Sequence, residues 1–277
     1  MLFRSKKMNS RIENLRKKTR EKEVTISHER AELVTAFYKK TSSMDKSIPV
    51  QRALCLKHVL ENKKIFIDDN ELIVGERGPE PKAVPTYPEI CLHSMEDLEI
   101  LDSRPKVPYK VCPETKRIYG EKIIPFWKGK TIREKIFKSM EDLWIDSFNA
   151  GIFTEFQEQR SPGHTAGGDL IYQKGFNDLK DDIRQCFKGI DFFKDKDGLE
   201  KQEVLTSLDI AADALIIFAI RHAEALESQA KDETDLKRKA ELENMARVCK
   251  KVPAQKPETF HEALQYYWFL HVGRSEE

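Results

Sequence analysis

One ten-residue stretch concentrates the residue types that could do chemistry. Between Arg160 and Asp169 the sequence RSPGHTAGGD holds one imidazole, three glycines and a proline. Pro162 fixes one φ angle, whereas glycines tolerate positive φ and let other groups approach the backbone closely. We therefore expect a rigid, bare loop that presents His164 with little side-chain cover.

The residues after this loop, DLIYQKGF, indicate the start of a helix with Asp169 as its N-terminal cap. A glycine loop that opens a helix can hold an anion on free N–H groups. The phosphate-loop pattern is absent, because no Gly-Lys-Ser/Thr follows. On spacing alone, the residues favour a structural turn over a substrate site.

A second set of chemically capable residues lies in the most apolar long helix, expected over residues 208–226. It carries Asp209, Asp213 and Arg221 among apolar neighbours. Asp213 and Arg221 are eight residues apart, which separates them by about 12 Å along a helix axis. Each needs an ion-pair partner of its own or a cavity, because a lone charge among apolar groups is costly.

The five cysteines are scattered, with no CxxC pair and no zinc-ligand spacing, which favours a reduced, cytoplasmic protein that binds no metal. Cys55 and His58 share one helix face, where core packing is favoured over metal binding.

The 48 basic and 47 acidic residues leave a net charge of +1, so the sequence has no overall basic charge that would indicate binding to nucleic acid. The basic N-terminus has no apolar signal-peptide core, and no segment is apolar enough to span a membrane.

The elements that must position these residues are mostly helices. Apolar spacing and caps predict a charged N-terminal helix or frayed tail to about residue 22, and further helices over 27–38, 50–62, 94–101, 113–123, 131–140, 178–187, 208–226, 231–251 and 257–271. Short extended segments are expected at 65–67 and 71–77, with a proline-rich loop at 78–88. We expect Pro125 to end the helix that Pro113 begins. The aromatic-rich segment 143–156 is expected to form a wall leading into the central loop.

Longer motifs carry a resemblance to a known family. The segments GHTAGGDLIYQKGF, TFHEALQYYWFLHVG and ELIVGERGPEPKAVPTYPEI resemble the N-terminal part of a glycyl radical enzyme of the pyruvate formate-lyase-like superfamily. Three further segments, EKIIPFWKGKTIREKI, FTEFQEQRSPGHT and VPAQKPETFHEAL, are most similar to the trans-4-hydroxy-L-proline dehydratase branch. The resemblance runs from about Ile26 to Gly273.

The resemblance implies a fold and a domain plan. The intact family fold is a ten-stranded α/β barrel jacketed by helices. A mainly α chain such as this one would supply the outer helical jacket, up to a first barrel strand. Residues 1–25 would form a basic N-terminal segment. Residues 26–277 would form the N-terminal part of a pyruvate formate-lyase-like domain, truncated before its catalytic loops.

The resemblance also implies what the chain lacks. In the family, a backbone glycyl radical oxidises a cysteine thiol, and the thiyl radical takes a hydrogen atom from the substrate. Dehydratase-type members place that cysteine in a Gly-Cys-x-Glu loop, and neither this loop nor the Arg-Val-x-Gly-Tyr/Phe radical loop occurs here. We therefore expect the chain to bind no cofactor itself and to be inactive alone.

The full enzyme would need the missing C-terminal portion and a glycyl radical. An S-adenosylmethionine iron–sulfur activating enzyme would install that radical, and the resemblance implies a homodimer acting on a small molecule.

Carried over residue by residue, the family's Gly-His-Thr matches Gly163, His164 and Thr165. The resemblance implies that His164 is the catalytic proton donor to the departing hydroxyl, and that His164, Thr165 and Arg221 bind the substrate. A histidine in that place makes water a better leaving group. Arg221 matches a buried family arginine. Its role is either substrate-carboxylate binding, for which a guanidinium offers a bidentate match, or a buried brace.

Three interpretations stay open. The first is the N-terminal portion of a glycyl radical dehydratase acting on trans-4-hydroxy-L-proline. The second is a fragment of another superfamily lyase, such as a glycerol or diol dehydratase, a choline lyase or a formate acetyltransferase. The third is a non-catalytic helical remnant or interaction module.

Overall fold

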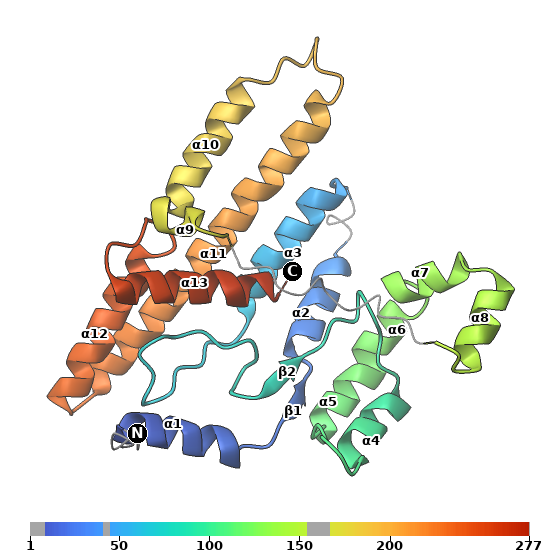
Figure 1. Ribbon diagram of the computed structural model, residues 1–277, viewed down its shortest axis with the longest axis horizontal. Coiled ribbons are helices and arrows are strands. Elements are labelled where there is room, and N and C mark those ends of the chain that lie inside the picture. Colours follow the sequence, from blue (N-terminus) through green and yellow to red (C-terminus); the bar gives the residue numbers. More distant parts are fainter. Residues whose placement is uncertain (1–8, 41–44, 154–166, 277) are drawn as a thin grey trace, which may run out of the picture.

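A computed structural model of the chain describes residues 9–40, 45–153 and 167–276. The architecture is mainly helical, as the sequence predicts (Figure 1). The first half of the described chain contains α1 (Ser10–Glu21), β1 (Thr25–Ser27), α2 (Glu29–Tyr38), α3 (Ile48–Asn62), β2 (Ala83–Pro85), α4 (Met95–Ser103), α5 (Pro113–Ile118), the π-helical turn η2 (Tyr119–Ile123), α6 (Ile124–Trp127), α7 (Ile132–Lys138) and α8 (Asp142–Asn149). The second half contains α9 (Leu170–Gln173), α10 (Phe176–Lys188), α11 (Gly198–Asp232), α12 (Leu236–Lys251) and α13 (Phe260–Arg274).

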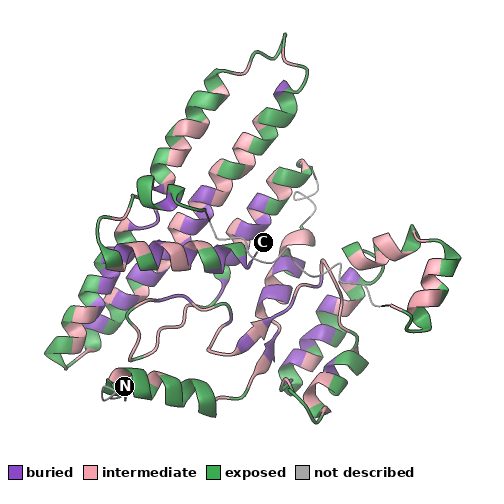
Figure 2. Cartoon of the chain, in the orientation of Figure 1, coloured by how far each residue is buried: buried purple, intermediate pink, exposed green. Residues whose placement is uncertain are grey.

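The main core forms where α11 packs against α3, α12 and α13 (Figure 2). Small residues on α11, such as Ala219 and Ala223, let the neighbouring helices approach, and the larger Phe218 and Leu226 fill the space between them. None of these four side chains is more than 1% exposed. At about 25 cal/mol per Å² of apolar surface removed from water, this burial is the main stabilising term.

A second core lies beside the first and shares α3 with it. Leu56 and Leu60 of α3 face the α11 core, whereas Cys55 and Val59 face the other side. The second core joins α2 and α3 to α4, α5, η2 and α6. Because successive residues of α3 turn toward different cores, this helix is buried on two faces.

The two strands form a small parallel sheet, with Thr25 opposite Ala83 and Ser27 opposite Pro85. Lys110 adds an isolated bridge to Thr25. These strands are not the extended segments expected from the sequence. The expected strands at 65–67 and 71–77 pair with no other strand among the described residues.

Side chains of α13 supply the hydrogen bonds that the 71–77 segment would otherwise find in a sheet. Gln265 accepts from the Val74 N–H at 2.9 Å and donates to the Val74 carbonyl at 2.8 Å. Trp268 Nε1 donates to the Gly75 carbonyl at 2.7 Å, and His261 Nε2 lies 2.7 Å from the Leu72 carbonyl. The segment therefore finds its backbone partners on α13, and the expectation of a strand at 71–77 is wrong.

Pro125 does not end its helix, which corrects the sequence expectation. The helix that begins at Pro113 passes through the π-helical turn η2 and continues as α6 to Trp127. The Ile124 N–H donates to the Tyr119 carbonyl, five residues back, so the backbone is locally wider than an α-helix. This wider turn accommodates a proline, which has no N–H to donate.

Other local expectations are confirmed. Ser94 and Thr131 each form a capping box, with Asp97 and Glu134 respectively. Lys180 pairs with Asp209 at 3.2 Å and also with Asp213, so these two carboxylates of α11 find a partner outside their own helix. No helix in the described part of the chain is long and apolar enough to cross a membrane.

Candidate functional site

His164 and Thr165 lie within residues 154–166, outside the part of the chain that the structure describes. The described end of their loop begins at Gly167. Gly167 and Gly168 have φ angles of +73° and +57°, in the left-handed region that side chains rarely adopt. The expectation that this loop needs glycines for positive φ is confirmed at these two positions.

The two glycines differ in their surroundings. A Cβ at Gly167 would lie 2.3 Å from Cγ2 of Ile171 and 3.0 Å from Cδ2 of Leu270 on α13, whereas a Cβ at Gly168 would meet nothing within 4 Å. The loop is therefore pressed against α13 at Gly167, three residues after His164. Only glycine fits there, for steric as well as conformational reasons.

Asp169 precedes the short helix α9 as expected, but its side chain caps nothing. Its backbone is already helical, with φ −82° and ψ −13°, and its carboxylate makes no capping hydrogen bond. The carboxylate instead accepts from Gln173 Nε2 at 3.4 Å. Asp169 thus occupies the expected N-cap position, but the expected hydrogen bond from the helix backbone to its side chain is not formed.

The chain beyond α9 is fastened at several points to α13 and to the turn after α12. Tyr266 Oη on α13 donates to the Lys174 carbonyl at 3.1 Å. The Phe176 N–H donates to the Pro253 carbonyl at 2.9 Å. At Gly175 a Cβ would lie 2.4 Å from Cα of Gln255. The C-terminal flank of the His164 loop is therefore held to the body by backbone contacts.

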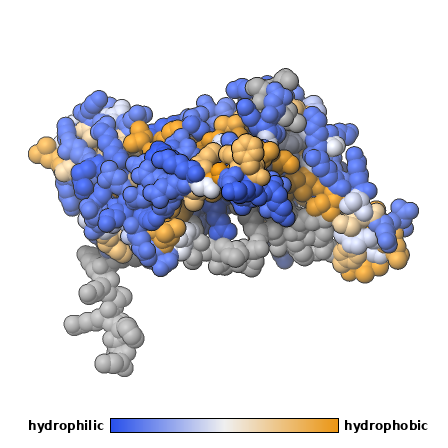
Figure 3. All heavy atoms as spheres, turned by 90° about the horizontal axis from the view of Figure 1, so that it is seen from above, coloured by the Kyte–Doolittle hydropathy of each residue, from blue (hydrophilic) through white to orange (hydrophobic). Residues whose placement is uncertain are grey.

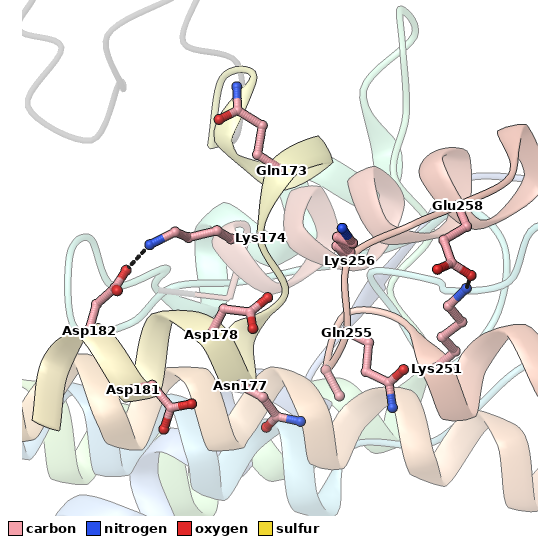
Figure 4. A pocket seen from close by; sticks show the side chains of 11 residues that line it. Gln173, Lys174, Asn177, Asp178, Asp181, Asp182, Lys251, Gln255, Lys256 and Glu258 are labelled. Carbon is pink, nitrogen blue, oxygen red and sulfur yellow. Dashed lines mark hydrogen bonds and ion pairs between the residues drawn. The ribbon is translucent and has the colours of Figure 1, made fainter.

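A polar hollow of about 620 Å³ opens beside this flank (Figure 4). Its charged lining residues are Lys174, Lys251, Lys256, Asp178, Asp181, Asp182 and Glu258. Lys174 pairs with Asp182, and Lys251 with Glu258 at 2.6 Å, so much of this charge is already neutralised. Among the residues that the structure describes, the lining has no histidine, cysteine or serine. This described lining can hold polar groups but offers no nucleophile with a base.

Arg221 lies on α11 and reaches the C-terminal end of α3. Its guanidinium donates to the carbonyls of Leu60 and Lys63 at 2.6 and 2.7 Å. Burial lowers the pKa of Arg221 from its ordinary value. These contacts are those of a brace, because a helix ends with carbonyls that lack intrahelical partners. Substrate binding by Arg221 stays a prediction.

A buried charge cluster lies near the C-terminal end of α3. It consists of Arg30, Lys63, Glu89 and Glu276. Arg30 donates to Glu89 at 2.6 Å and contacts the Glu276 carboxylate at 3.3 Å. Lys63 Nζ lies 2.6 Å from Glu276 and also donates to the Glu76 and Arg77 carbonyls. Burial acts to lower the pKa of Arg30, but the neighbouring carboxylates outweigh it and raise that pKa.

The cluster ties the segment around Glu89 to α2 and to the end of α13. Besides its ion pairs, Arg30 donates to the carbonyls of Thr86 and Glu276. The burial of Arg30 has one indication in the sequence, because Arg30 directly precedes the apolar stripe that begins at Ala31. For Lys63 and Glu276 the sequence gives no comparable signal.

The N-terminal flank of the His164 loop differs from the C-terminal flank, because its helices α7 and α8 have no buried residue. The N–H groups of Ile132 and Arg133, at the start of α7, donate to the Glu89 and Ile90 carbonyls at 3.0 Å each. Beyond them, α7 and α8 form a hairpin around four rings, those of Phe137, Trp144, Phe148 and Phe153. No residue of either helix is buried. We call residues 132–153 the aromatic hairpin.

Among the described residues, no group of three or more histidine, cysteine, aspartate or glutamate side chains is placed to hold a metal ion. The described cysteines are all free, and burial raises the pKa of the Cys55 and Cys249 thiols to about 12. Neither thiol is therefore available as a thiolate nucleophile at neutral pH.

The sequence and the fold of this chain are similar to those of known proteins. The chain is 48% identical to trans-4-hydroxy-L-proline dehydratase of Clostridioides difficile, over 96% of its own length and 34% of the relative's. It is 32% identical to isethionate sulfite-lyase of Nitratidesulfovibrio vulgaris, over 89% of its length and 31% of the relative's. The fold matches the crystal structure of hydroxyproline dehydratase from C. difficile with trans-4-hydroxy-L-proline bound. That match has a TM-score of 0.92 and 46% identity, and it covers 98% of this chain and 34% of the other.

The chain thus spans about a third of the length of the relatives that it matches. The model of the pyruvate formate lyase-like family matches residues 6–277. The resemblance drawn from the motifs is confirmed, and the chain belongs to the pyruvate formate lyase-like family.

Proposed function

We propose that this chain forms the N-terminal, substrate-side part of a glycyl radical lyase that removes water from trans-4-hydroxy-L-proline. The observation that carries the proposal is the higher identity to the hydroxyproline dehydratase than to the sulfite-lyase, over nearly the whole chain. The names of the two relatives differ in the group that is removed, water in the dehydratase and sulfite in the sulfite-lyase. Similarity to the dehydratase therefore favours loss of a hydroxyl group.

Residues beyond this chain supply the radical chemistry in this proposal. A glycyl radical, installed by an S-adenosylmethionine iron–sulfur activating enzyme, oxidises a cysteine thiol, and the resulting thiyl radical takes a hydrogen atom from the substrate. The full enzyme is proposed to work as a homodimer in the cytoplasm.

The chain's own contribution is to protonate the departing hydroxyl. His164 donates a proton to that oxygen, so that water leaves in place of hydroxide as the carbon–oxygen bond breaks. Thr165 offers a hydroxyl that can hydrogen-bond the substrate. The contact of Gly167 with Leu270 supports the proposal, because it fixes the backbone three residues from His164 against α13. A proton donor is effective only when its distance to the acceptor is held constant.

The proposed role of Arg221 is to bind the substrate carboxylate with the N–H groups that the protein leaves unused. Two of its donors already bond the carbonyls that end α3. A guanidinium has five N–H groups, so donors remain that can reach a substrate carboxylate. Its role as a carboxylate-binding residue in the full enzyme depends on those remaining donors.

The test is His164→Gln in the full-length, activated enzyme, with turnover of trans-4-hydroxy-L-proline and melting temperature measured on one preparation. Loss of a general acid costs about 10²–10⁴-fold in rate. We expect a fall in turnover of that size at an unchanged melting temperature, because the side chain acts on the substrate rather than on the core.

The matched control is His28→Gln, since His28 lies 3.0 Å from Thr115 Oγ1 in the second core, far along the chain from the loop. This control should turn over at close to the normal rate. Near-normal turnover by a destabilised His164→Gln enzyme would contradict the proposal and make the histidine a structural residue.

A further inference from the structure

A second hollow, of about 660 Å³, lies over the small sheet and the end of α4. We call it the Arg77–Arg104 hollow. Its lining residues come from β1, β2, the segments before and after β2, the end of α4 and the segment that follows it: Ile26, Arg77, Val84, Pro85, Thr86, Tyr87, Ile90, Cys91, His93, Leu101, Arg104 and Tyr109. Ligand sites in proteins typically measure about 300–1,000 Å³, so this one is large enough for a small molecule.

The floor of the hollow is apolar. Ile26 and Val84 are neighbours in the parallel sheet, and Leu101 reaches the same surface from α4. These side chains belong to the second core or pack against it. An apolar group placed in the hollow would extend that core and remove its surface from water.

Within residues 9–40, 45–153 and 167–276, the charged residues of the lining are all cationic. Arg77 and Arg104 contribute guanidinium groups, and none of these described lining residues is an aspartate or glutamate. Three carboxylates lie nearby. Glu89 pairs with Arg30 and Asp102 with Lys116, whereas Asp97 accepts from the Ser94 N–H at the start of α4. The hollow therefore combines positive charge with an apolar floor.

Both guanidinium groups are oriented by the protein and keep further donors. Arg77 donates through one terminal nitrogen to Tyr87 Oη at 3.0 Å. Arg104 donates through Nε to the Val107 carbonyl at 2.8 Å, and its guanidinium lies 5.2 Å from the centre of the Tyr109 ring. Bonding through Nε leaves the terminal nitrogens of Arg104 available for a bidentate contact with a carboxylate.

His93 adds a neutral polar group. Its ring nitrogens make no hydrogen bond with any residue that the structure describes, and the residue is half-buried in the lining. Burial lowers the pKa of His93, while the charge of Asp97 acts to raise it. The ring is therefore uncharged at neutral pH, and it can donate one hydrogen bond to an occupant and accept another.

We propose that the Arg77–Arg104 hollow binds a small molecule with an apolar body and a single carboxylate. The apolar body lies on the Ile26, Val84 and Leu101 floor. The carboxylate meets Arg104 and Arg77 at the rim, where a planar guanidinium matches its two oxygens. This site is argued independently of the proposed lyase activity, and its failure would leave that activity untouched.

The experiment measures binding of 4-phenylbutyrate to the 277-residue chain by isothermal titration calorimetry, with 4-phenylbutyramide as the uncharged probe of the same shape. We expect the acid to bind, and the amide to bind at least about tenfold more weakly, since a hydrogen bond to a charged group is worth roughly this factor. Arg104→Gln and Arg77→Gln should each weaken binding of the acid by about tenfold and leave binding of the amide unchanged. Arg104→Lys keeps the positive charge but loses the bidentate geometry of the guanidinium. Its affinity for the acid should lie between that of the wild type and that of Arg104→Gln.

The matched control is Arg117→Gln, because Arg117 pairs with Glu114 of α5 and Glu121 of η2 and lies outside the hollow. It should bind the acid as the wild type does, and melting curves should show that each variant is folded. Equal binding of acid and amide, no binding of the acid, or a loss in Arg117→Gln as large as in Arg104→Gln would each overturn the proposal. If Arg104→Gln does not fold, the comparison of acid with amide and the Arg77→Gln variant decide.

Discussion

The α11 core and the aromatic hairpin are both built from helices rich in apolar and aromatic residues, yet they are buried to very different degrees. Phe218, at the centre of the α11 core, is fully buried. In the hairpin, Leu143 is 76% exposed and Ile152 is 75% exposed. Seen from above, hydrophobic atoms gather at the end of the molecule where α7 and α8 lie (Figure 3). The two regions differ in what they pack against, since α11 contacts four other helices, α3, α10, α12 and α13, whereas the rings of the hairpin contact one another.

The same difference separates the two flanks of the His164 loop. The loop follows the aromatic hairpin on one side and runs into Gly167, pressed against α13, on the other. One flank is therefore fixed to the main core, and the other leads from a segment with little burial. Local stability in proteins follows buried apolar contacts, so the two flanks should open at different free energies.

The largest expected effect lies in the core. Phe218→Ala should lower the free energy of unfolding by about 3–5 kcal/mol, because it deletes a fully buried ring and leaves a cavity. Denaturant unfolding followed by circular dichroism measures this loss. Phe193→Ala is the matched control, since Phe193 is 102% exposed at the tip between α10 and α11. That substitution should change stability by less than about 0.5 kcal/mol. Equal losses from the two variants would remove the contrast.

The next effect is a dependence of core stability on pH. His222 is 1% exposed, and burial, reinforced by the charges of Lys63 and Arg221, lowers its pKa to about 4. The unfolded chain binds a proton at this residue below its ordinary pKa of 6.5, whereas the folded chain stays neutral until about pH 4. The stabilisation is therefore present above pH 6.5 and is lost as the pH falls toward 4, by up to about 3 kcal/mol.

Denaturant unfolding of the wild type and of His222→Gln across pH 4–7 isolates this contribution, because the other titrating groups are common to both. The wild type should lose more free energy of unfolding than His222→Gln as the pH falls. Parallel curves would show that the buried imidazole does not titrate as its surroundings require.

The smallest expected effect on global stability lies in the hairpin. Trp144→Ala removes a ring that stacks on Phe148 at 5.7 Å and meets Phe137 at 5.2 Å, but no residue of α7 or α8 is buried. The free energy of unfolding of the whole chain should fall by less than about 1 kcal/mol. Amide hydrogen exchange should nevertheless quicken in α8 and stay unchanged in α11. A loss like that of Phe218→Ala would mean that the hairpin and the core unfold as one unit.

Most helices could be predicted from the sequence because their signals are local. A cap such as Ser94 or Thr131 depends on residues within one turn, and the stripe on α11 is readable from its spacing. The π-helical turn before Pro125 has no such signal, since proline usually ends a helix. Contacts between helices have no local signal either. Phe218 on α11 and Phe269 on α13 contact each other in the main core, with ring centres 5.8 Å apart.

The candidate site could be predicted only in part, because only its local features can be read from the sequence. Positive φ at Gly167 and Gly168 follows from residue type, but the contact of Gly167 with Leu270 joins residues about a hundred positions apart. Likewise, the bonds between Gln265 and Val74 connect distant segments, so an extended segment looked like a strand. The role of His164 came from resemblance to a family and stays a prediction, because the residue lies outside the described part of the chain.

The sharing of α3 by two cores has a consequence during synthesis. The second core is complete once the ribosome has made Trp127, whereas the α11 core needs residues from Gly198 onward. At translation rates of about 5–20 residues per second, Leu56 and Leu60 would face solvent for on the order of ten seconds before α11 emerges. The nascent chain would thus carry α3 with only one of its two apolar faces covered through that interval.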